Sequence, residues 1–246
     1  MIEIRDLEVR IGDRVIAAVP HLDVGPGQCV AIVGESGSGK TTTLLAILGL
    51  LDEAATVTGS IEAFGVRSPS TLRGSKIALV MQSPQGALTP TMRLGTLLRR
   101  ALALHGVRGR AAADRTRQAL RDVLLEDEIL RRYPHQVSGG QAQRFALALA
   151  LALGAEVILA DEPTSALDVT VQAEVVAVLR RLHEERGLAV LLVSHDLALV
   201  SSIADHVVVM KDGQVVESGP AAEMFAHPAA GYTRELIAAT PELPDA

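Results

Sequence analysis

A glycine-rich stretch between two apolar segments constrains this chain more than any other feature. It reads GESGSGKT over residues 34–41, follows an apolar run at 29–33 and precedes a helical pattern at 42–51. A strand, a glycine-rich turn and a helix in this order indicate a phosphate-binding loop, because backbone N–H groups and the positive end of the helix point at the anion. Lys40 can reach the β- and γ-phosphates of a nucleotide, and the Thr41 hydroxyl can ligate Mg²⁺. We expect the nucleotide to contact Gly34, Glu35, Ser36, Gly37, Ser38, Gly39, Lys40, Thr41 and Thr42.

The composition fits one large domain, or one domain with an inserted lobe, and disfavours nucleic acid as a partner. Of the 246 residues, 48% are hydrophobic, which is enough for a sizeable core. The formal net charge is −6, so there is no general basic surplus to neutralise a phosphate backbone. Aromatic residues make up only 2% of the chain, which argues against a base-stacking surface. A cluster of arginines between 108 and 121 is interpreted as a solvated helix face, or as a rim near acidic lipid or a partner, rather than as a nucleic-acid site.

Cysteine usage and hydropathy narrow the class of protein further. Cys29 is the only cysteine, so the chain can form neither an internal disulfide nor a Cys-rich metal site. The first ten residues alternate between apolar and charged, unlike a signal peptide, and no apolar run reaches the length of a membrane span. We therefore expect a cytosolic chain that meets membranes only through partners.

The order of predicted elements indicates an α/β fold with a mainly parallel sheet. Residues 1–10 and 15–24 predict two strands, the first irregular at Asp6–Leu7 and the second broken near Pro20. This antiparallel start predicts a β-layer beside the parallel sheet. Further strands are predicted at 29–33, 58–64, 77–81, 157–160, 188–193 and 207–210, followed by a hairpin at 212–217. Helices are predicted at 42–51, 94–104, 111–125, 138–153, 169–186, 196–204, 220–226 and 231–239.

The composition changes after residue 85, where breaks at Ser83–Gly86 and Thr89–Thr91 precede a helical region. This change predicts a helical subdomain at 86–150. It would be inserted into a nucleotide-binding core made of 1–85 and 151–246.

Four polar sites come directly after predicted apolar strands: the loop to Lys40, then Gln82, Asp161–Glu162 and His195. Because the carboxyl ends of parallel strands meet at one edge of a sheet, we expect a single site there. Asp161 could hold Mg²⁺ directly or through water, and Glu162 could orient or deprotonate an attacking water. His195 could hydrogen-bond the γ-phosphate, although a lone histidine is also often structural. Gln82 could contact Mg²⁺ or water.

A second phosphate-suited helix start lies at Ser138, Gly139, Gly140 and Gln141. Ser138 is a natural N-cap, and we expect the glycines to leave the first N–H groups of the helix bare. One nucleotide does not need two such helix ends, which favours a dimer in which each subunit's Ser138–Gln141 closes over the nucleotide of the other. A Ser-capped helix with a flexible entry is the simpler alternative.

Together these motifs make the chain resemble the nucleotide-binding subunits of ATP-binding cassette (ABC) transporters over essentially its whole length. In that family GESGSGKT is the Walker A loop, Gln82 the Q-loop, VSGGQ at 137–141 the signature motif, and VILADE at 157–162 the Walker B strand. SALD at 165–168 resembles the D-loop, and His195 the switch histidine. The fold that the resemblance implies is the P-loop NTPase (RecA-like) sheet with an inserted helical subdomain. MQSPQGALTP at 81–90 and YPHQVSGGQAQR at 133–144 resemble the importers of oligopeptides, dipeptides and nickel.

The resemblance implies an ATPase that uses ATP and Mg²⁺, with Lys40, Glu162, His195 and Gln82 as catalytic residues. Thr41, Gln82 and Asp161 would be the metal ligands. Its partners would be a second ATPase subunit, two transmembrane permeases and, indirectly, a substrate-binding protein, at the cytoplasmic face of the membrane. Many relatives stack adenine on an early aromatic residue, but that position falls near Ile11 here, and no aromatic residue precedes Phe64. We therefore expect a less specific grip on the base.

Other functions remain open from the residues alone. A P-loop kinase would transfer phosphate to an acceptor and has no use for Ser138–Gln141. A non-transport ABC ATPase of ribosomes or DNA would usually carry tandem cassettes or long coiled coils, which are missing here. A nucleotide-sensing regulator would not need Glu162.

Overall fold

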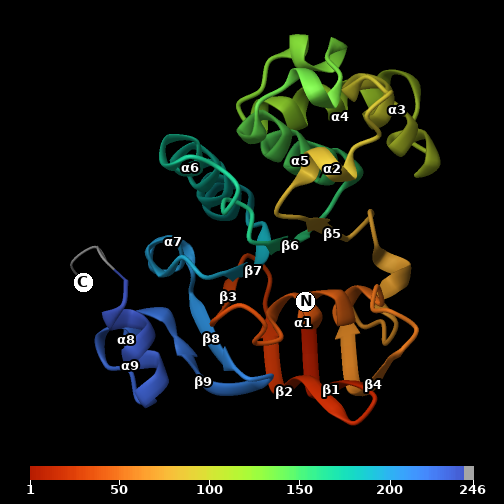
Figure 1. The fold of residues 1–246 in the computed structure, drawn as a ribbon. Coiled ribbons are helices and arrows are strands. Elements are labelled where there is room, and N and C mark those ends of the chain that lie inside the picture. Colours follow the sequence, from red (N-terminus) through yellow and green to blue (C-terminus); the bar gives the residue numbers. More distant parts are fainter. Residues whose placement is uncertain (241–246) are drawn as a thin grey trace. The chain divides into compact units, whose positions relative to one another are not determined.

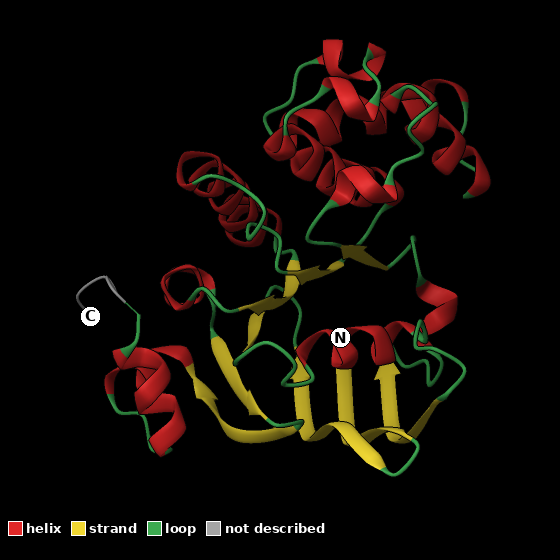
Figure 2. Ribbon diagram, viewed as in Figure 1, coloured by secondary structure: helices red, strands yellow, loops and turns green. Residues whose placement is uncertain are grey.

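The computed structural model describes residues 1–240, which form two compact units (Figures 1 and 2). Unit 1 combines Met1–Arg73 with the chain from Gly187 onward, and unit 2 is Gly74–Arg186. The predicted helical subdomain, 86–150, falls inside unit 2, which also contains two strands and a long helix. Its proposed boundary with the core stays a prediction.

Unit 1 contains a mixed sheet in the order β4-β1-β2-β9-β8-β3-β7. The strands β4, β1 and β2 are antiparallel, whereas β8, β3 and β7 are parallel. The predicted antiparallel layer is therefore continuous with the parallel part, through β9. The strands of unit 1 are β1 Ile2–Ile11, β2 Arg14–Val24, β3 Cys29–Val33, β4 Ala55–Ala63, β7 Ala189–Ser194, β8 His206–Lys211 and β9 Gln214–Pro220.

The centre of this sheet is built from uniformly apolar strands. Every residue of β3 and of β7 is buried, as expected for parallel strands covered on both faces. The outer strand β1 instead alternates between buried and exposed residues, because only one of its faces meets the core. The predicted range for β3, 29–33, agrees with the structure.

The predicted break near Pro20 is wrong, because β2 runs through it. On the β1 side, Leu7 pairs with Val19 and Arg5 with His21, and the intervening Asp6 adopts a positive φ of 48°. The irregularity predicted in β1 therefore lies opposite the proline. The missing N–H of Pro20 falls where the ladder is already interrupted, so the strand can continue.

The helices of unit 1 lie against this sheet (Figure 1). Helix α1 contacts β1 and β2, α7 contacts β3 and β7, and α8 contacts β8 and β9. The helices are η1 Pro69–Leu72 (a 3₁₀ turn), α1 Lys40–Leu48, α7 Leu197–Ile203, α8 Ala221–Ala226 and α9 Gly231–Ala238. Helix α1 starts two residues earlier than predicted and ends three residues earlier, at Leu48, because the left-handed backbone of Gly49 closes the last turn.

Unit 2 is a pair of parallel strands with mostly helical chain around it. Helix α5 is central to this unit, with neighbours α2, α3, α4 and α6, and it buries Phe145 completely. The predicted break at Ser83–Gly86 is a short helix instead, started by Pro84. The elements are β5 Ile77–Val80, α2 Pro84–Ala87, α3 Leu94–Leu104, α4 Gly109–Asp122, η2 Asp127–Arg131, η3 Pro134–Gln136, α5 Gly139–Leu153, β6 Val157–Asp161 and α6 Val169–Arg186.

Candidate nucleotide site

The glycine-rich loop connects β3 to α1, as the sequence predicted, and its conformation depends on glycine. Gly34, Gly37 and Gly39 all have positive φ, at 146°, 82° and 98°. A Cβ on Gly34 would overlap the carbonyl oxygen of Met210, and one on Gly39 would lie 2.6 Å from the carbonyl oxygen of Ile16. The loop is therefore packed against the backbone of neighbouring strands at Gly34 and Gly39, and neither position has room for a side chain.

Lys40 is buried at the start of α1, with 5% of its surface exposed. Its Nζ donates hydrogen bonds to the carbonyl oxygens of Gly34, at 2.8 Å, and of Glu35, at 2.7 Å. A buried ammonium group is costly unless it is hydrogen-bonded, and these carbonyls meet part of that need. The loop thus wraps around a cation, which is the arrangement expected of a site for polyphosphate.

The start of α1 is suited to an anion. Its N-cap is Gly39, and no side-chain hydrogen bond caps this end of the helix, where the positive end of the helix dipole lies. Thr41 is exposed in that turn, whereas Thr43 is buried and its hydroxyl donates to the carbonyl oxygen of Gly39 at 3.0 Å. The Thr41 hydroxyl oxygen lies beside the phosphate loop and suits Mg²⁺, which prefers oxygen ligands.

His195 shares an edge of the sheet with this loop. Val33 of β3 pairs with Ser194 of β7 in parallel, so Gly34 and His195 are the first residues beyond two paired strand ends. His195 is exposed, and the next residue, Asp196, caps α7 by accepting a hydrogen bond from the N–H of Leu199 at 3.0 Å. The sequence prediction that these two strand ends are neighbours is confirmed within unit 1.

Gln82, Asp161 and Glu162 form a corresponding group in unit 2. Val80 of β5 pairs with Ala160 of β6, so Asp161, the last residue of β6, and Glu162 and Gln82, which come after the two strands, lie at neighbouring strand ends. Gln82 is exposed, and the two carboxylates are half-buried. Two carboxylates and an amide at one sheet edge form a donor set of hard oxygen atoms, which suits Mg²⁺.

Glu162 has an unusual backbone. Its φ is 45°, in the left-handed region that residues other than glycine rarely adopt. Its carbonyl oxygen accepts hydrogen bonds from the Ser165 N–H, at 3.3 Å, and from the Ser165 hydroxyl, at 3.1 Å. This turn fixes where the carboxylate leaves the strand, and strain of this kind is often found at functional sites.

The second helix start is more tightly built than the sequence suggested. Ser138 caps α5 as predicted, and it forms a reciprocal capping box with Gln141 in which each side chain accepts from the other residue's N–H, both at 3.2 Å. The expectation of bare N–H groups is therefore wrong for Ser138 and Gln141. A Cβ on Gly140 would overlap Val171, so this glycine is also required by packing against α6.

Two residues bear on the remaining sequence predictions. Ile11 ends β1 with 48% of its surface exposed, so an apolar side chain is available near the predicted adenine position.

Glu35, predicted to contact phosphate, donates its N–H to the hydroxyl of Tyr232 at 3.1 Å. Sequence reasoning missed Tyr232, because it lies 197 residues further along the chain in a short helix with no motif.

A groove of about 820 Å³ lies in unit 2, away from every residue predicted for the site. Arginines line it, among them Arg99 of α3, Arg108 at the N-cap of α4 and Arg131 of η2, and these three are exposed. Solvent and salt screen such charges, in keeping with the solvated helix face inferred from the sequence.

None of the helices within residues 1–240 is long and apolar enough to cross a membrane.

Comparison with known proteins identifies the family. The ABC transporter family profile matches residues 19–165. A putative peptide import ATP-binding protein of Brucella abortus is 41% identical over 236 residues, covering 92% of this chain and 71% of the relative. A peptidoglycan transport ATP-binding protein, YejF of Agrobacterium fabrum, is 43% identical over 232 residues, but this chain spans only 42% of its length.

Among solved structures, the chain resembles a dimeric post-hydrolysis state of the ATP-binding cassette MJ0796 bound to ADP and phosphate. The TM-score is 0.76 at 28% identity, and the match covers 90% of this chain and 99% of that one. The P-loop NTPase fold inferred from the sequence is confirmed. With its phosphate loop, its Mg²⁺-compatible carboxylates and these matches, the chain belongs to the ABC transporter family, as an ATP-binding cassette with ATPase activity.

Proposed function

We propose that this chain is the ATP-hydrolysing subunit of a peptide importer. The observation that carries the proposal is the glycine-dependent loop at 34–39 wrapped around the buried ammonium group of Lys40. Relatives named for peptide import support the choice of cargo, whereas the nickel alternative rests on family resemblance alone.

In the proposed site, the chain's own groups each have a separate task. Lys40 and the uncapped start of α1 bind and orient the β- and γ-phosphates. Glu162 accepts a proton from the attacking water, and His195 and Gln82 hold the γ-phosphate and the water in line. Thr41, Gln82 and Asp161 are the proposed ligands of Mg²⁺, which when bound neutralises charge on the phosphate oxygens.

The proposed active form is a dimer of ATPase subunits. Ser138, Gly139, Gly140 and Gln141 of one subunit would close over the nucleotide held by the other. The solved cassette that this chain resembles is itself described as dimeric, with ADP and phosphate bound. The second copy can be identical or a related subunit, since both half-sites of this chain carry the required residues.

Transport would follow from dimer closure. Two transmembrane permeases would dock on the chain near residues 82–88 and change access as the subunits close, and a substrate-binding protein would deliver the peptide. The chain would then work at the cytoplasmic face of the membrane, as a peripheral subunit. No nucleic acid takes part in this scheme.

Two experiments test the proposal. The purified chain is incubated with γ-labelled ATP and Mg²⁺, and the label should appear as free phosphate. Transfer of the label to a small acceptor would indicate a kinase instead. The chain is then isolated from native membranes and its partners are identified; permeases and a peptide-binding protein are expected, and recovery with ribosomes or DNA in their place would overturn the transport assignment.

A further inference from the structure

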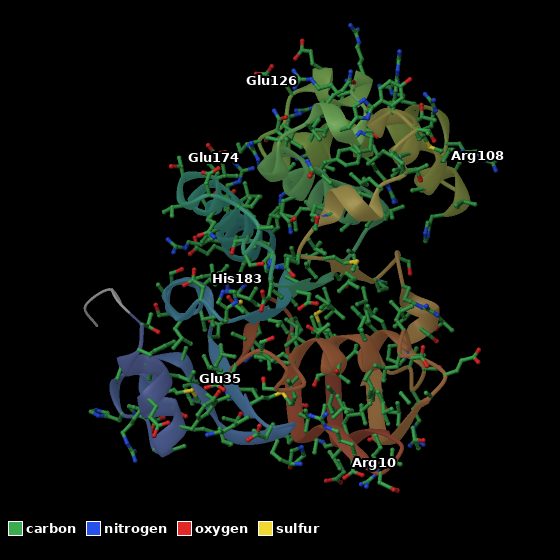
Figure 3. The ribbon with its side chains drawn as sticks, viewed as in Figure 1. Arg10, Glu35, Arg108, Glu126, Glu174 and His183 are labelled. Carbon is green, nitrogen blue, oxygen red and sulfur yellow. The ribbon has the colours of Figure 1, made fainter. Side chains whose placement is uncertain are left out.

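The phosphate loop is attached to the C-terminal part of unit 1 through Glu35 and Tyr232. The Glu35 N–H donates to the Tyr232 hydroxyl at 3.1 Å, and the Glu35 carbonyl oxygen accepts from Lys40 Nζ at 2.7 Å. Figure 3 labels Glu35 beside this C-terminal part of the unit. The backbone N–H and the backbone carbonyl of Glu35 are thus both hydrogen-bonded, which fixes the orientation of the two peptide groups at the entrance of the loop.

Tyr232 is itself held in place by a cation. The Nζ of Lys211 lies 4.4 Å from the centre of the Tyr232 ring, a distance at which a cation is attracted to the ring face. Lys211 ends β8 and follows Met210, whose carbonyl oxygen packs against Gly34. The end of β8 and the start of α9 therefore converge on the same two loop residues, Gly34 and Glu35.

The start of α9 is anchored to the sheet independently of the loop. The Glu217 carboxylate on β9 accepts hydrogen bonds from the N–H groups of Ala229, at 2.8 Å, and Ala230, at 3.0 Å. Arg234 donates to the carbonyl oxygens of Pro228, at 3.0 Å, and Ala229, at 2.7 Å. These contacts fix the segment before Tyr232, so the hydroxyl reaches Glu35 from a rigid support rather than from a loose terminus.

We propose that Tyr232 is a positioning residue for the phosphate loop, through which helix α9 sets the affinity for nucleotide. This inference rests on the proposed role of residues 34–41 as the phosphate site. Tyr232 does not need to touch the nucleotide. It holds the loop entrance in the orientation that Lys40 and the following N–H groups require, so less conformational freedom is lost when phosphate binds.

The proposed role predicts an effect on binding rather than on chemistry. An anchor that is equally present in the ground state and the transition state changes KM and leaves kcat unchanged. Partial burial raises the pKa of Tyr232, and the neighbouring carboxylates Glu35, Asp212 and Glu235 add to the rise against the opposing hydrogen bond from Glu35. Its hydroxyl therefore stays protonated, and the effect should be the same between about pH 6 and 9.

Tyr232→Phe tests the hydroxyl while keeping the ring, and Lys211→Met tests the cation that holds the ring. Tyr133→Phe is the matched control, because it removes the hydroxyl of the chain's only other tyrosine, which belongs to unit 2. Each variant is compared with the wild type in three measurements: the Kd for ADP by calorimetry, KM and kcat for ATP, and amide hydrogen exchange of the peptide covering residues 34–41 without nucleotide.

Loss of one hydrogen bond should raise the Kd for ADP and the KM for ATP about two- to tenfold in Tyr232→Phe, at unchanged kcat. Exchange of the loop amides should become faster in Tyr232→Phe and in Lys211→Met. In Tyr133→Phe, the Kd for ADP, the KM for ATP and the exchange of the loop amides should all stay as in the wild type. Wild-type Kd together with wild-type exchange in Tyr232→Phe would overturn the inference. If the wild-type chain itself bound no ADP, the proposed phosphate site would fail, and the exchange comparison would still decide whether Tyr232 holds the loop.

Discussion

The side-chain ammonium group of Lys40 donates a hydrogen bond to the carbonyl oxygen of Glu35 at 2.7 Å, inside the loop that it would use to hold phosphate. Lys40 → Met removes the charge and keeps most of the apolar stem, so the loop loses its central donor. ATP turnover should fall by about 10²- to 10³-fold, the usual cost of losing one electrostatic stabiliser of a transition state. Phosphate release and ATP binding are measured together.

Lys76→Met is the control for this prediction. Lys76 pairs with Glu156 on the surface of unit 2, where such pairs contribute little. Its turnover should match the wild type. Tight ATP binding and rapid turnover in Lys40→Met would contradict the role of Lys40.

Glu162→Gln should separate binding from hydrolysis. The amide keeps the size of the side chain and cannot accept the proton from water, so ATP should still bind while turnover falls by about 10²- to 10⁴-fold. The readouts are ATP binding at equilibrium and the rate of phosphate release. Glu156→Gln, at the residue directly before β6 and outside the proposed site, should behave as the wild type. A Glu162→Gln variant that turns over ATP normally would exclude Glu162 as the base.

Gly140→Ala should destabilise the packing of α5 on α6. The added methyl group would overlap Cγ1 of Val171, and overpacking of this kind costs about 1–3 kcal/mol in unfolding free energy. Val171→Ala removes the opposing methyl group, so the double variant should recover part of this loss, as a positive coupling in a double-mutant cycle. Gly139→Ala should cost less, because its Cβ would lie 2.8 Å from Cδ2 of Leu167, the end of a flexible side chain. Equal losses of unfolding free energy in Gly140→Ala, Gly139→Ala and the double variant, measured by denaturant unfolding, would argue against this packing.

The Cys29 thiol should be inert in the folded chain. Burial, and secondarily the nearby Asp205 carboxylate, raises its pKa to about 12 from the usual 9.0. The thiolate is therefore absent at pH 8, and alkylation should require unfolding, which mass spectrometry with and without denaturant can follow.

The raised pKa of the Cys29 thiol also makes the stability of the folded chain depend on pH at high pH. Above pH 9.0 an unfolded chain loses the thiol proton while the folded chain keeps it, so the contribution of Cys29 to stability is complete below that pH and falls between 9.0 and about 12. Compared with Cys29→Ala, the wild type should lose more stability over this interval. Rapid alkylation at pH 8 without denaturant would show that the thiol is not enclosed.

Secondary structure and site residues could be predicted from the sequence wherever function or burial imposes a local pattern of residue types. The strand at 29–33 and the helix at 169–186 were predicted with the bounds that the structure has, and the phosphate loop was predicted between the strand and the helix that it connects. A uniformly apolar run of five residues and a helical pattern closed by Gly187 leave few other choices for where the strand and the helix begin and end. The pairing of the strand ends before Gly34 and His195 also followed from the rule that parallel strands end at one edge.

Errors arose where a distant partner decides the outcome. Pro20 indicated a break by itself, and only the irregularity at Asp6 in the neighbouring strand allows β2 to continue. Gly140 was interpreted through its N–H group alone, because its contact with Val171 depends on how two helices pack. Tyr232 could not be connected to Glu35, since no periodicity links positions so far apart in the chain.

The position of β3 between β7 and β8 has a consequence for synthesis. Both neighbours of Cys29–Val33 begin at or after Ala189, more than 150 residues later in the chain. An apolar strand therefore leaves the ribosome long before either of its hydrogen-bonding partners exists, and such separated pairings form slowly. Until then its edges are open to aggregation, a hazard that a nascent-chain chaperone would relieve. Nucleotide binding is consequently acquired only after the residues of β7 and β8 have been translated.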